Sequence, residues 1–406
     1  MTSTFAFPEI NETECLDFLS TLIKFKSLTQ TPGEQEITQY LTDQMRALGL
    51  DADIYPFNNG TRQNAIGRWK GTGDSSGKSK SLLFNGHVDT NPVSEGWTID
   101  PWAGLYDKEF IYGIGVSNMK SGCAAYFCAV RELLKAGFKP KSDVVLTYVV
   151  GELQGGVGTV AAIEQGLMSA DCFINCEPTD IRAITMHAES LIFSIELTGI
   201  TRHMSAREEA VDVILAACKL IPILTEMKFS DARSERHESI NRCHVGIVRA
   251  ALGKEFVEWR PPQVADFLRM SGAARFAPGQ TREGVLADIQ RVVGKFCDSV
   301  PGLKVDVKQY GMQGMPSFEV DENAAVVKSL NQAYKETRAK EQPMGALPPP
   351  CFYGSDAGHL LKRLGMEGVV CGPGGRYNTR PDEKVDNVDY LDCIRMFMRV
   401  IVDICG

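Results

Sequence analysis

The chain has 406 residues, of which 44% are hydrophobic and 23% are charged. A chain of this length can bury at least one large core, and two domains are the natural expectation. The net charge of −8 comes without a basic block, which argues against a nucleic-acid partner and against an anionic membrane surface. No run approaches the roughly 18 apolar residues that span a bilayer.

The N-terminus and the cysteines indicate the compartment. The first residues lack a charged segment followed by an apolar run, so no signal peptide is expected. Among the twelve cysteines, the pairs closest in sequence are Cys123 with Cys128 and Cys172 with Cys176, and neither has the CxxC spacing of a metal or redox motif. We therefore expect free, buried thiols in a reducing, cytoplasmic environment.

Helices and strands alternate along the first part of the chain. Apolar spacing predicts helices over residues 14–25, 31–48, 122–136 and 158–166, and it predicts strands over residues 64–69, 81–85, 143–150 and 172–176. The run 143–150 is continuously apolar and β-branched, which is typical of a central parallel strand. This alternation favours an α/β domain whose site lies at the carboxyl ends of the strands.

The order of the predicted helices and strands changes after residue 185. A strand at 190–197, a helix at 208–224, short strands at 245–248 and 273–276 and a helix at 281–293 give a β-α-β-β-α-β order. This order predicts an inserted α+β, ferredoxin-like domain over residues 184–312. Helices at 323–336 and 388–405 return to the first pattern, so residues 1–183 and 313–406 form the catalytic-type domain, with a mixed, mostly parallel sheet flanked by helices.

The chemistry is concentrated in short motifs. Asn85-Gly86-His87-Val88-Asp89 ends a strand, so it presents an imidazole at the sheet edge with a carboxylate two residues on to orient it. Further motifs follow at 96–102, 112–122, 150–158, 176–179 and 372–383. Together they resemble, in order, the aminoacylase, acetylornithine deacetylase and succinyl-diaminopimelate desuccinylase family of zinc peptidases, clan MH.

The resemblance implies a role for each matching residue. His87 stands where the family has its first histidine ligand, Asp89 looks like the carboxylate that orients it, and Glu177 matches the acidic ligand of the first zinc. Glu152 matches the general base that takes a proton from the attacking water. His203 resembles a histidine that reaches across a dimer interface to the oxyanion, so a homodimer through an inserted lid domain is expected.

Three positions depart from the family. Asn118 stands where the aspartate that bridges the two zinc ions is expected, Leu153 replaces a glutamate ligand, and Asn378 replaces the C-terminal histidine. Because Zn²⁺ needs about four good donors, these changes remove the second zinc and leave the first with His87, Glu177 and an amide. We therefore expect no metal cofactor, or at most one weakly held zinc.

Substrate contacts are predicted on both domains. Arg275 aligns with a family arginine that grips a substrate carboxylate, and Glu258 replaces an amide that contacts the same group. Gly374 lies in a glycine-rich loop that lets the backbone approach the cleft. Asn118, Glu177 and Asn378 complete this set. His359 is tempting as a replacement ligand, but it is expected on a helix that begins after Ser355.

Three functions follow from these residues. The first is a repurposed, biosynthetic enzyme that uses metal-independent acid/base chemistry for a condensation, cyclisation or elimination on a small amino-acid-derived substrate. In it, Glu152 acts with His87 and His203, because burial without a nearby cation raises a carboxyl pKa. The alternative is a hydrolase of amide or peptide bonds with one metal ion at His87, Asn118 and Glu177, and the third is a non-catalytic binding homologue.

Overall fold

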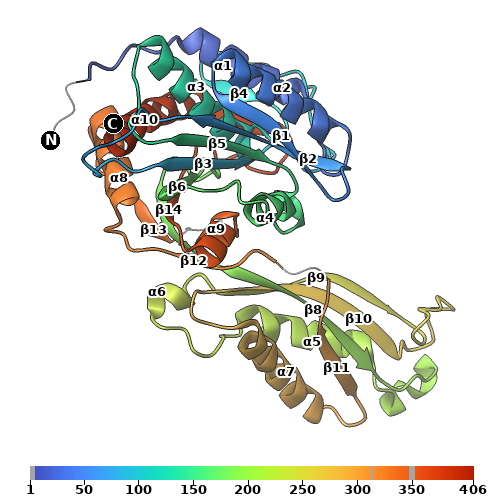
Figure 1. Ribbon diagram of the computed structural model, residues 1–406. Coiled ribbons are helices and arrows are strands. Elements are labelled where there is room, and N and C mark those ends of the chain that lie inside the picture. The colour runs from blue at the N-terminus through green and yellow to red at the C-terminus, as the bar shows by residue number, and fades with distance from the viewer. Residues whose placement is uncertain (1–4, 312–313, 347–352) are drawn as a thin grey trace. The chain divides into compact units, whose positions relative to one another are not determined.

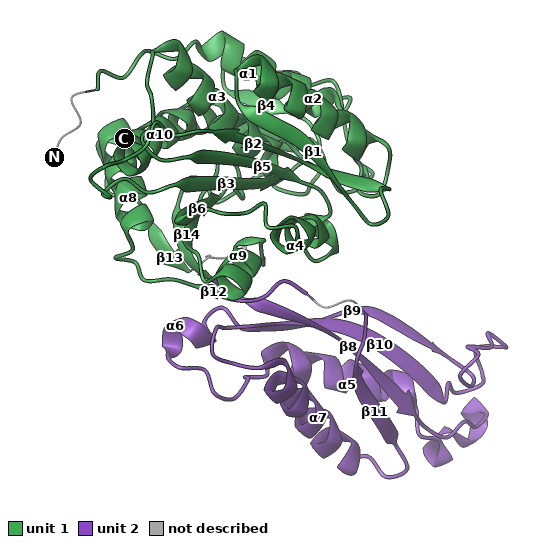
Figure 2. Ribbon diagram, in the orientation of Figure 1, with its two compact units in different colours: residues 1–186, 318–406 green, residues 187–317 purple. Residues whose placement is uncertain are grey.

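The chain folds into two compact units. The computed structural model describes residues 5–311, 314–346 and 353–406. Residues 1–186 with 318–406 form unit 1, and residues 187–317 form unit 2 (Figure 2). The inserted unit begins three residues after the predicted residue 184, because strand β7 (Ala183–His187) still pairs within the sheet of unit 1. Its predicted end, residue 312, lies outside the described residues.

The sheet of unit 1 has nine strands in the order β1-β2-β5-β3-β6-β14-β7-β12, and β13 also pairs with β7. The central pairs β5–β3, β3–β6 and β6–β14 are parallel, whereas β1–β2 and β2–β5 are antiparallel. The predicted mixed, mostly parallel sheet is therefore confirmed. Besides β7, its strands are β1 (Asp51–Phe57), β2 (Arg62–Trp69), β3 (Leu82–His87), β5 (Val144–Val149), β6 (Cys172–Asn175), β12 (Phe318–Glu319), β13 (Met344–Ala346) and β14 (Glu367–Val370).

Helices cover both faces of this sheet. Successive side chains of a strand point to opposite faces, and both sets are apolar here, so each face needs a layer of helices to bury it. Leu82 and Phe84 of β3 join one core cluster with α1, α2, α3, α8 and α10, and Leu83 joins a second cluster with α4 and α9 (Figure 1). The helices are α1 (Glu12–Lys24), α2 (Gly33–Ala47), α3 (Ser121–Lys135), α4 (Val157–Glu164), α8 (Ala325–Arg338), α9 (Ala357–Leu364) and α10 (Asn387–Cys405), with short helical turns η1 (Val116–Lys120) and η2 (Glu152–Gln154).

Unit 1 also contains a small two-stranded sheet. Strands β4 (Phe110–Tyr112) and β15 (Lys384–Asp386) form a separate antiparallel pair, which brings together two segments far apart in sequence. Within the described ranges, no helix combines the length and the apolar character needed to cross a bilayer.

Unit 2 is an antiparallel sheet with the strand order β11-β8-β10-β9, which packs through one face on α5 and α7. Its elements follow the predicted β-α-β-β-α-β order. They are β8 (Glu189–Thr198), η3 (Met204–Glu209), α5 (Val213–Glu226), α6 (Glu235–Glu238), β9 (Arg242–Ala251), β10 (Phe267–Phe276), α7 (Arg282–Asp298) and β11 (Lys304–Gln309).

Two boundaries in unit 2 differ from the prediction. The helix expected from residue 208 begins at Val213, because the Asp212 side chain caps it by accepting hydrogen bonds from the Ile214 and Leu215 amides. Strands β9 and β10 are also longer than predicted. Their polar residues, such as Arg242 and Arg269, lie on the exposed face and interrupt the apolar pattern without ending the strand.

Candidate active site

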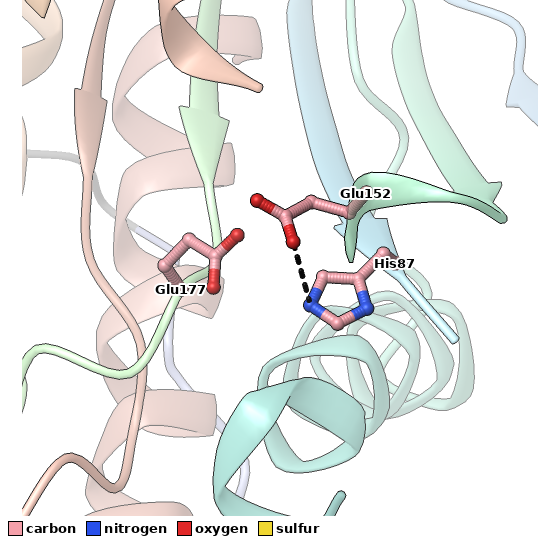
Figure 3. Close-up of side chains that lie close together, drawn as sticks. All are labelled: His87, Glu152 and Glu177. Carbon is pink, nitrogen blue, oxygen red and sulfur yellow. Dashed lines mark ion pairs between the residues drawn. The ribbon is translucent and has the colours of Figure 1, made fainter. Parts of the chain in front are cut away.

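Three neighbouring strands end at the same edge of the sheet and bring three side chains together. His87 is the last residue of β3, Glu152 follows β5, and Glu177 follows β6. Since β3 pairs in parallel with both β5 and β6, their carboxyl ends lie side by side. One ligand atom from each of the three residues lies within 4.8 Å of the others (Figure 3). His87 Nε2 is 3.9 Å from Glu152 Oε2.

The buried His87 ring is held through both nitrogens. Nδ1 lies 3.0 Å from the Asp89 carbonyl oxygen and 3.4 Å from Asp89 Oδ1, and Nε2 lies 3.0 Å from Asn118 Oδ1. Asp89 is therefore beside Nδ1, but its main-chain oxygen is nearer than its carboxylate. The Gly151 amide and the Thr29 hydroxyl donate to the Asp89 carboxylate, each at 2.8 Å. Asp89 thus links the ring to the loop that carries Glu152.

The electrostatics of the cluster are dominated by burial and by an excess of acids. Burial and then the charge of Glu177 raise the pKa of Glu152 well above its usual range. Burial raises the pKa of Glu177 to about 7. Burial opposes protonation of His87, but the hydrogen bond and charge of Asp89, with both glutamates, raise its pKa well above its ordinary value. Without a cation the site therefore holds more acidic groups than its one imidazole can neutralise.

Two acids that motif analysis did not select also belong to this region. Asp356, just before α9, is buried, accepts a hydrogen bond from the Thr159 hydroxyl at 2.6 Å, and raises the pKa of Glu177 through its charge. Glu383 accepts hydrogen bonds from the Ser117 amide at 2.7 Å and the Asn118 amide at 3.2 Å. Glu383 ends the motif at 372–383, so it could have been selected there, but no sequence pattern marks Asp356.

The loop after β14 lies against the segment that carries Asn118. Gly374 has a φ of 79°, and a Cβ there would lie 2.6 Å from Ser117 Oγ, so a side chain does not fit. The Gly375 amide donates to Ser117 Oγ at 3.0 Å. Asn378 Oδ1 is buried and has no hydrogen-bond partner in the described part of the chain. His359 lies on α9 as predicted, and its Nε2 is 2.9 Å from the Gly155 carbonyl oxygen.

The remaining predicted site residues lie in unit 2. His203 is exposed and caps η3, where its Nδ1 accepts a hydrogen bond from the Ser205 amide. Arg275 lies near the end of β10, opposite Ser190 of β8. Glu258 is exposed in the loop between β9 and β10. Each has a defined place within its own unit, and their roles at the cluster of unit 1 stay predictions.

A buried ion pair lies beneath the loop of Glu152. The Arg62 and Glu34 side chains are only 8% and 2% exposed and pair at 2.5 Å. Arg62 Nη1 also donates to Gln154 Oε1, two residues after Glu152, at 2.6 Å. We expect Arg62→Met to lower the free energy of unfolding by about 3–5 kcal/mol, because it leaves Glu34 buried without its cation. Urea denaturation measures this change.

The double variant Arg62→Met with Glu34→Leu serves as the control. It removes both charges, so we expect it to recover most of the stability lost in the single variant. A single variant within about 1 kcal/mol of the parent protein, the upper range for an exposed ion pair, would contradict a structural role for this pair.

Comparisons with known proteins place the chain in a family. The model of peptidase family M20/M25/M40 matches residues 83–403. An N-formyl-4-amino-5-aminomethyl-2-methylpyrimidine deformylase from Bacillus subtilis (strain 168) is 26% identical over 98% of this chain and 96% of its own length. A succinyl-diaminopimelate desuccinylase from a Nitratiruptor species is 27% identical over 80% of this chain and 82% of its own.

Solved structures share the fold. An aminopeptidase PepT from Bacillus cereus superposes with a TM-score of 0.75 at 19% identity, over 98% of this chain and all of its own. A metallo-carboxypeptidase from Sulfolobus solfataricus gives 0.71 at 18% identity, over 96% of this chain and 98% of its own.

The family match and the deformylase-named relative indicate an enzyme of the peptidase-like hydrolase kind. The chain belongs to peptidase family M20/M25/M40, which confirms the zinc-peptidase resemblance of its motifs.

The side chains of the cluster match what a bound metal ion, which this family implies, would need. Glu177 Oε1 is buried and has no hydrogen-bond partner among the described residues, which is costly for a carboxylate unless a cation satisfies it. His87 and Glu177 offer an imidazole and a carboxylate within reach of one ion, and Glu152 and the Asn118 amide oxygen lie close to them. The residues therefore fit one divalent cation.

Proposed function

We propose that this protein hydrolyses the amide bond of a small N-acyl compound with one divalent metal ion. The observation that carries the proposal is the group of His87, Glu152 and Glu177 within 4.8 Å, with one buried oxygen of Glu177 unpaired among the described residues. A base beside a cation-binding pair is what amide hydrolysis needs.

We assign the metal to His87 and Glu177, with the Asn118 amide oxygen as a third, weaker donor. Asn118 Oδ1 lies 3.0 Å from His87 Nε2, the ring nitrogen that would hold the ion. When bound, the metal polarises the carbonyl oxygen of the substrate and stabilises the negative charge that develops there. Leu153 and Asn378 supply no anionic donor for a second ion, so the two-ion arrangement does not fit.

The chain's own residues carry out the proton transfers. Glu152 accepts a proton from the water that attacks the carbonyl carbon, and it then delivers this proton to the leaving nitrogen as the C–N bond breaks. Asp89 holds His87 in place and, through the Gly151 amide, positions the loop that carries Glu152. His203 is proposed to donate a hydrogen bond to the oxyanion, as the family resemblance implies.

Hydrolysis is favoured over metal-independent bond formation. The deformylase that this chain resembles over almost its full length is named for removing a formyl group, and the other named relative removes a succinyl group. Both names describe removal of a small acyl group. Metal-independent acid/base chemistry by Glu152 is the second candidate, and its observation is the raised pKa of that buried glutamate.

A substrate panel with metal analysis separates these candidates. The purified protein is assayed against N-formyl, N-acetyl and N-succinyl amines and against dipeptides, before and after dialysis with a chelator. We expect hydrolysis of the N-acyl amines, its loss on chelation and its recovery with Zn²⁺ or Mn²⁺. Activity that is indifferent to the chelator would favour the metal-independent candidate, and no hydrolysis of any compound would reject the proposal.

We also propose that the protein is a homodimer formed through unit 2. Strand β9 is an edge of its sheet, and an unpaired edge strand readily pairs with a second copy. Ile247 and Val248 on β9 are 67% and 48% exposed, and Ile214 and Leu215 of α5 are also exposed. An apolar edge of this kind is stabilised when another chain covers it.

We therefore expect Ile247→Asp to convert the dimer to a monomer, because it places a charge in the proposed interface. Sedimentation velocity measures the mass of the particle. Val388→Asp is the matched control, since Val388 is 63% exposed but lies in unit 1. A parent protein that sediments as a monomer would refute the dimer.

A further inference from the structure

A cavity beside the catalytic cluster has the features of a carboxylate-binding site. It has a volume of about 460 Å³, lies wholly within unit 1, and is lined in part by Trp97, Asn118, Thr379 and Arg380. Asn118 is shared with the cluster, because its Oδ1 lies 3.0 Å from His87 Nε2. A molecule in this cavity is therefore next to the proposed reacting centre.

Two of the three segments that line the cavity, residues 91–97 and 379–383, are fastened to each other. The Asp382 carboxylate accepts hydrogen bonds from the Thr98 amide at 2.9 Å and the Thr98 hydroxyl at 2.7 Å. Gly96 packs against Pro381, where an added Cβ would lie 3.2 Å from the proline ring. These contacts hold the segment of Trp97 against the segment of Arg380, so tertiary contacts define this part of the cavity.

The cavity lining contains one cation and one acid, the exposed Arg380 and the buried Glu383. Glu383, the acid in its lining, is buried and accepts hydrogen bonds from the amides of Ser117 and Asn118, so its carboxylate is already satisfied. Arg380 is exposed at the cavity, and within the described residues no carboxylate forms an ion pair with it. Its guanidinium lies over the Tyr377 ring at 4.7 Å from the centroid, which holds the cation without neutralising it.

These observations identify the ligand by its chemistry. An arginine without an acid partner binds planar anions through paired hydrogen bonds. Thr379 can donate a hydrogen bond beside it, and Trp97 offers a flat apolar wall. Resting on the proposed function, we propose that this cavity binds a carboxylate-bearing part of the substrate and that Arg380 selects for it.

Acid and amide pairs test the selection. The substrates are N-formylglycine, N-formyl-β-alanine and N-formyl-4-aminobutyrate, each compared with its primary amide. We expect the best acid to exceed its amide in kcat/KM by about 10-fold to 100-fold, the usual value of a charged hydrogen bond. Arg380→Gln is expected to bring this ratio close to one, because it raises KM for the acid far more than KM for the amide. Lys108→Gln, which removes an exposed cation outside the lining, is the matched control.

Calorimetry of the Glu152→Gln protein gives a readout that does not need turnover. We expect it to bind the acid at least about 10-fold more tightly than the amide, and Arg380→Gln in the same background to abolish the difference. The absence of an Arg380-dependent preference for the acid overturns the inference, whether or not the compounds are hydrolysed. Arg380-dependent binding without hydrolysis would support this site while it rejects the proposed function.

Discussion

Replacing Glu152 with glutamine is expected to lower kcat/KM by about 10²-fold to 10⁴-fold, the usual contribution of a positioned general base. Glutamine keeps the size of the side chain but cannot accept the proton from water. The Glu152 carboxylate lies 3.9 Å from His87 Nε2 and in the same group as Glu177, so no other acid of this group can replace it without displacing a proposed metal ligand. Steady-state kinetics on the best N-acyl substrate measures the loss.

The metal content and the fold provide the controls for this variant. Glu152 is proposed as a base and not as the main metal ligand, so Glu152→Gln should keep its ion and its melting temperature. Glu36→Gln, on the exposed side of α2, changes the same chemical group far from the cluster and should be fully active. A Glu152→Gln protein with near-normal activity would remove the central residue of the proposal.

Restoring the three altered positions is expected to restore a second metal ion. The triple variant Asn118→Asp, Leu153→Glu and Asn378→His supplies a bridging carboxylate, a second carboxylate and an imidazole. Together with His87 and Glu177, these give two ions the anionic and nitrogen donors that zinc prefers. We expect metal analysis of dialysed protein to rise from about one ion per chain to about two.

The single variant Asn118→Asp is the control for this experiment. It strengthens the site at His87 and Glu177 by adding a charge next to His87 Nε2, but it adds no further ligand for a second ion. It should therefore bind one ion more tightly and not bind two. A parent protein that already retains two ions per chain after dialysis would show that Leu153 and Asn378 do not prevent a second site.

The meeting of His87, Glu152 and Glu177 could be predicted from the sequence because it depends on short-range information. His87, Glu152 and Glu177 each follow a strand that the apolar pattern identifies, and parallel neighbours end at one edge of the sheet. The positions of β9 and β10 were harder to predict, because arginines on their exposed faces break the apolar pattern. Strands shorter than four residues, such as β12 and β13, gave too few residues for any periodicity.

The sequence by itself determined the family, the α/β and α+β units, and the chemical identity of the cluster, because motifs and strand ends are local properties of the chain. Only the tertiary structure placed Asp356 beside Glu177 and closed the cavity of Arg380. Those contacts join segments hundreds of residues apart, such as Thr98 with Asp382 at a separation of 284 residues. No local sequence pattern predicts these contacts between distant loops, because they depend on how the strands are ordered in the sheet.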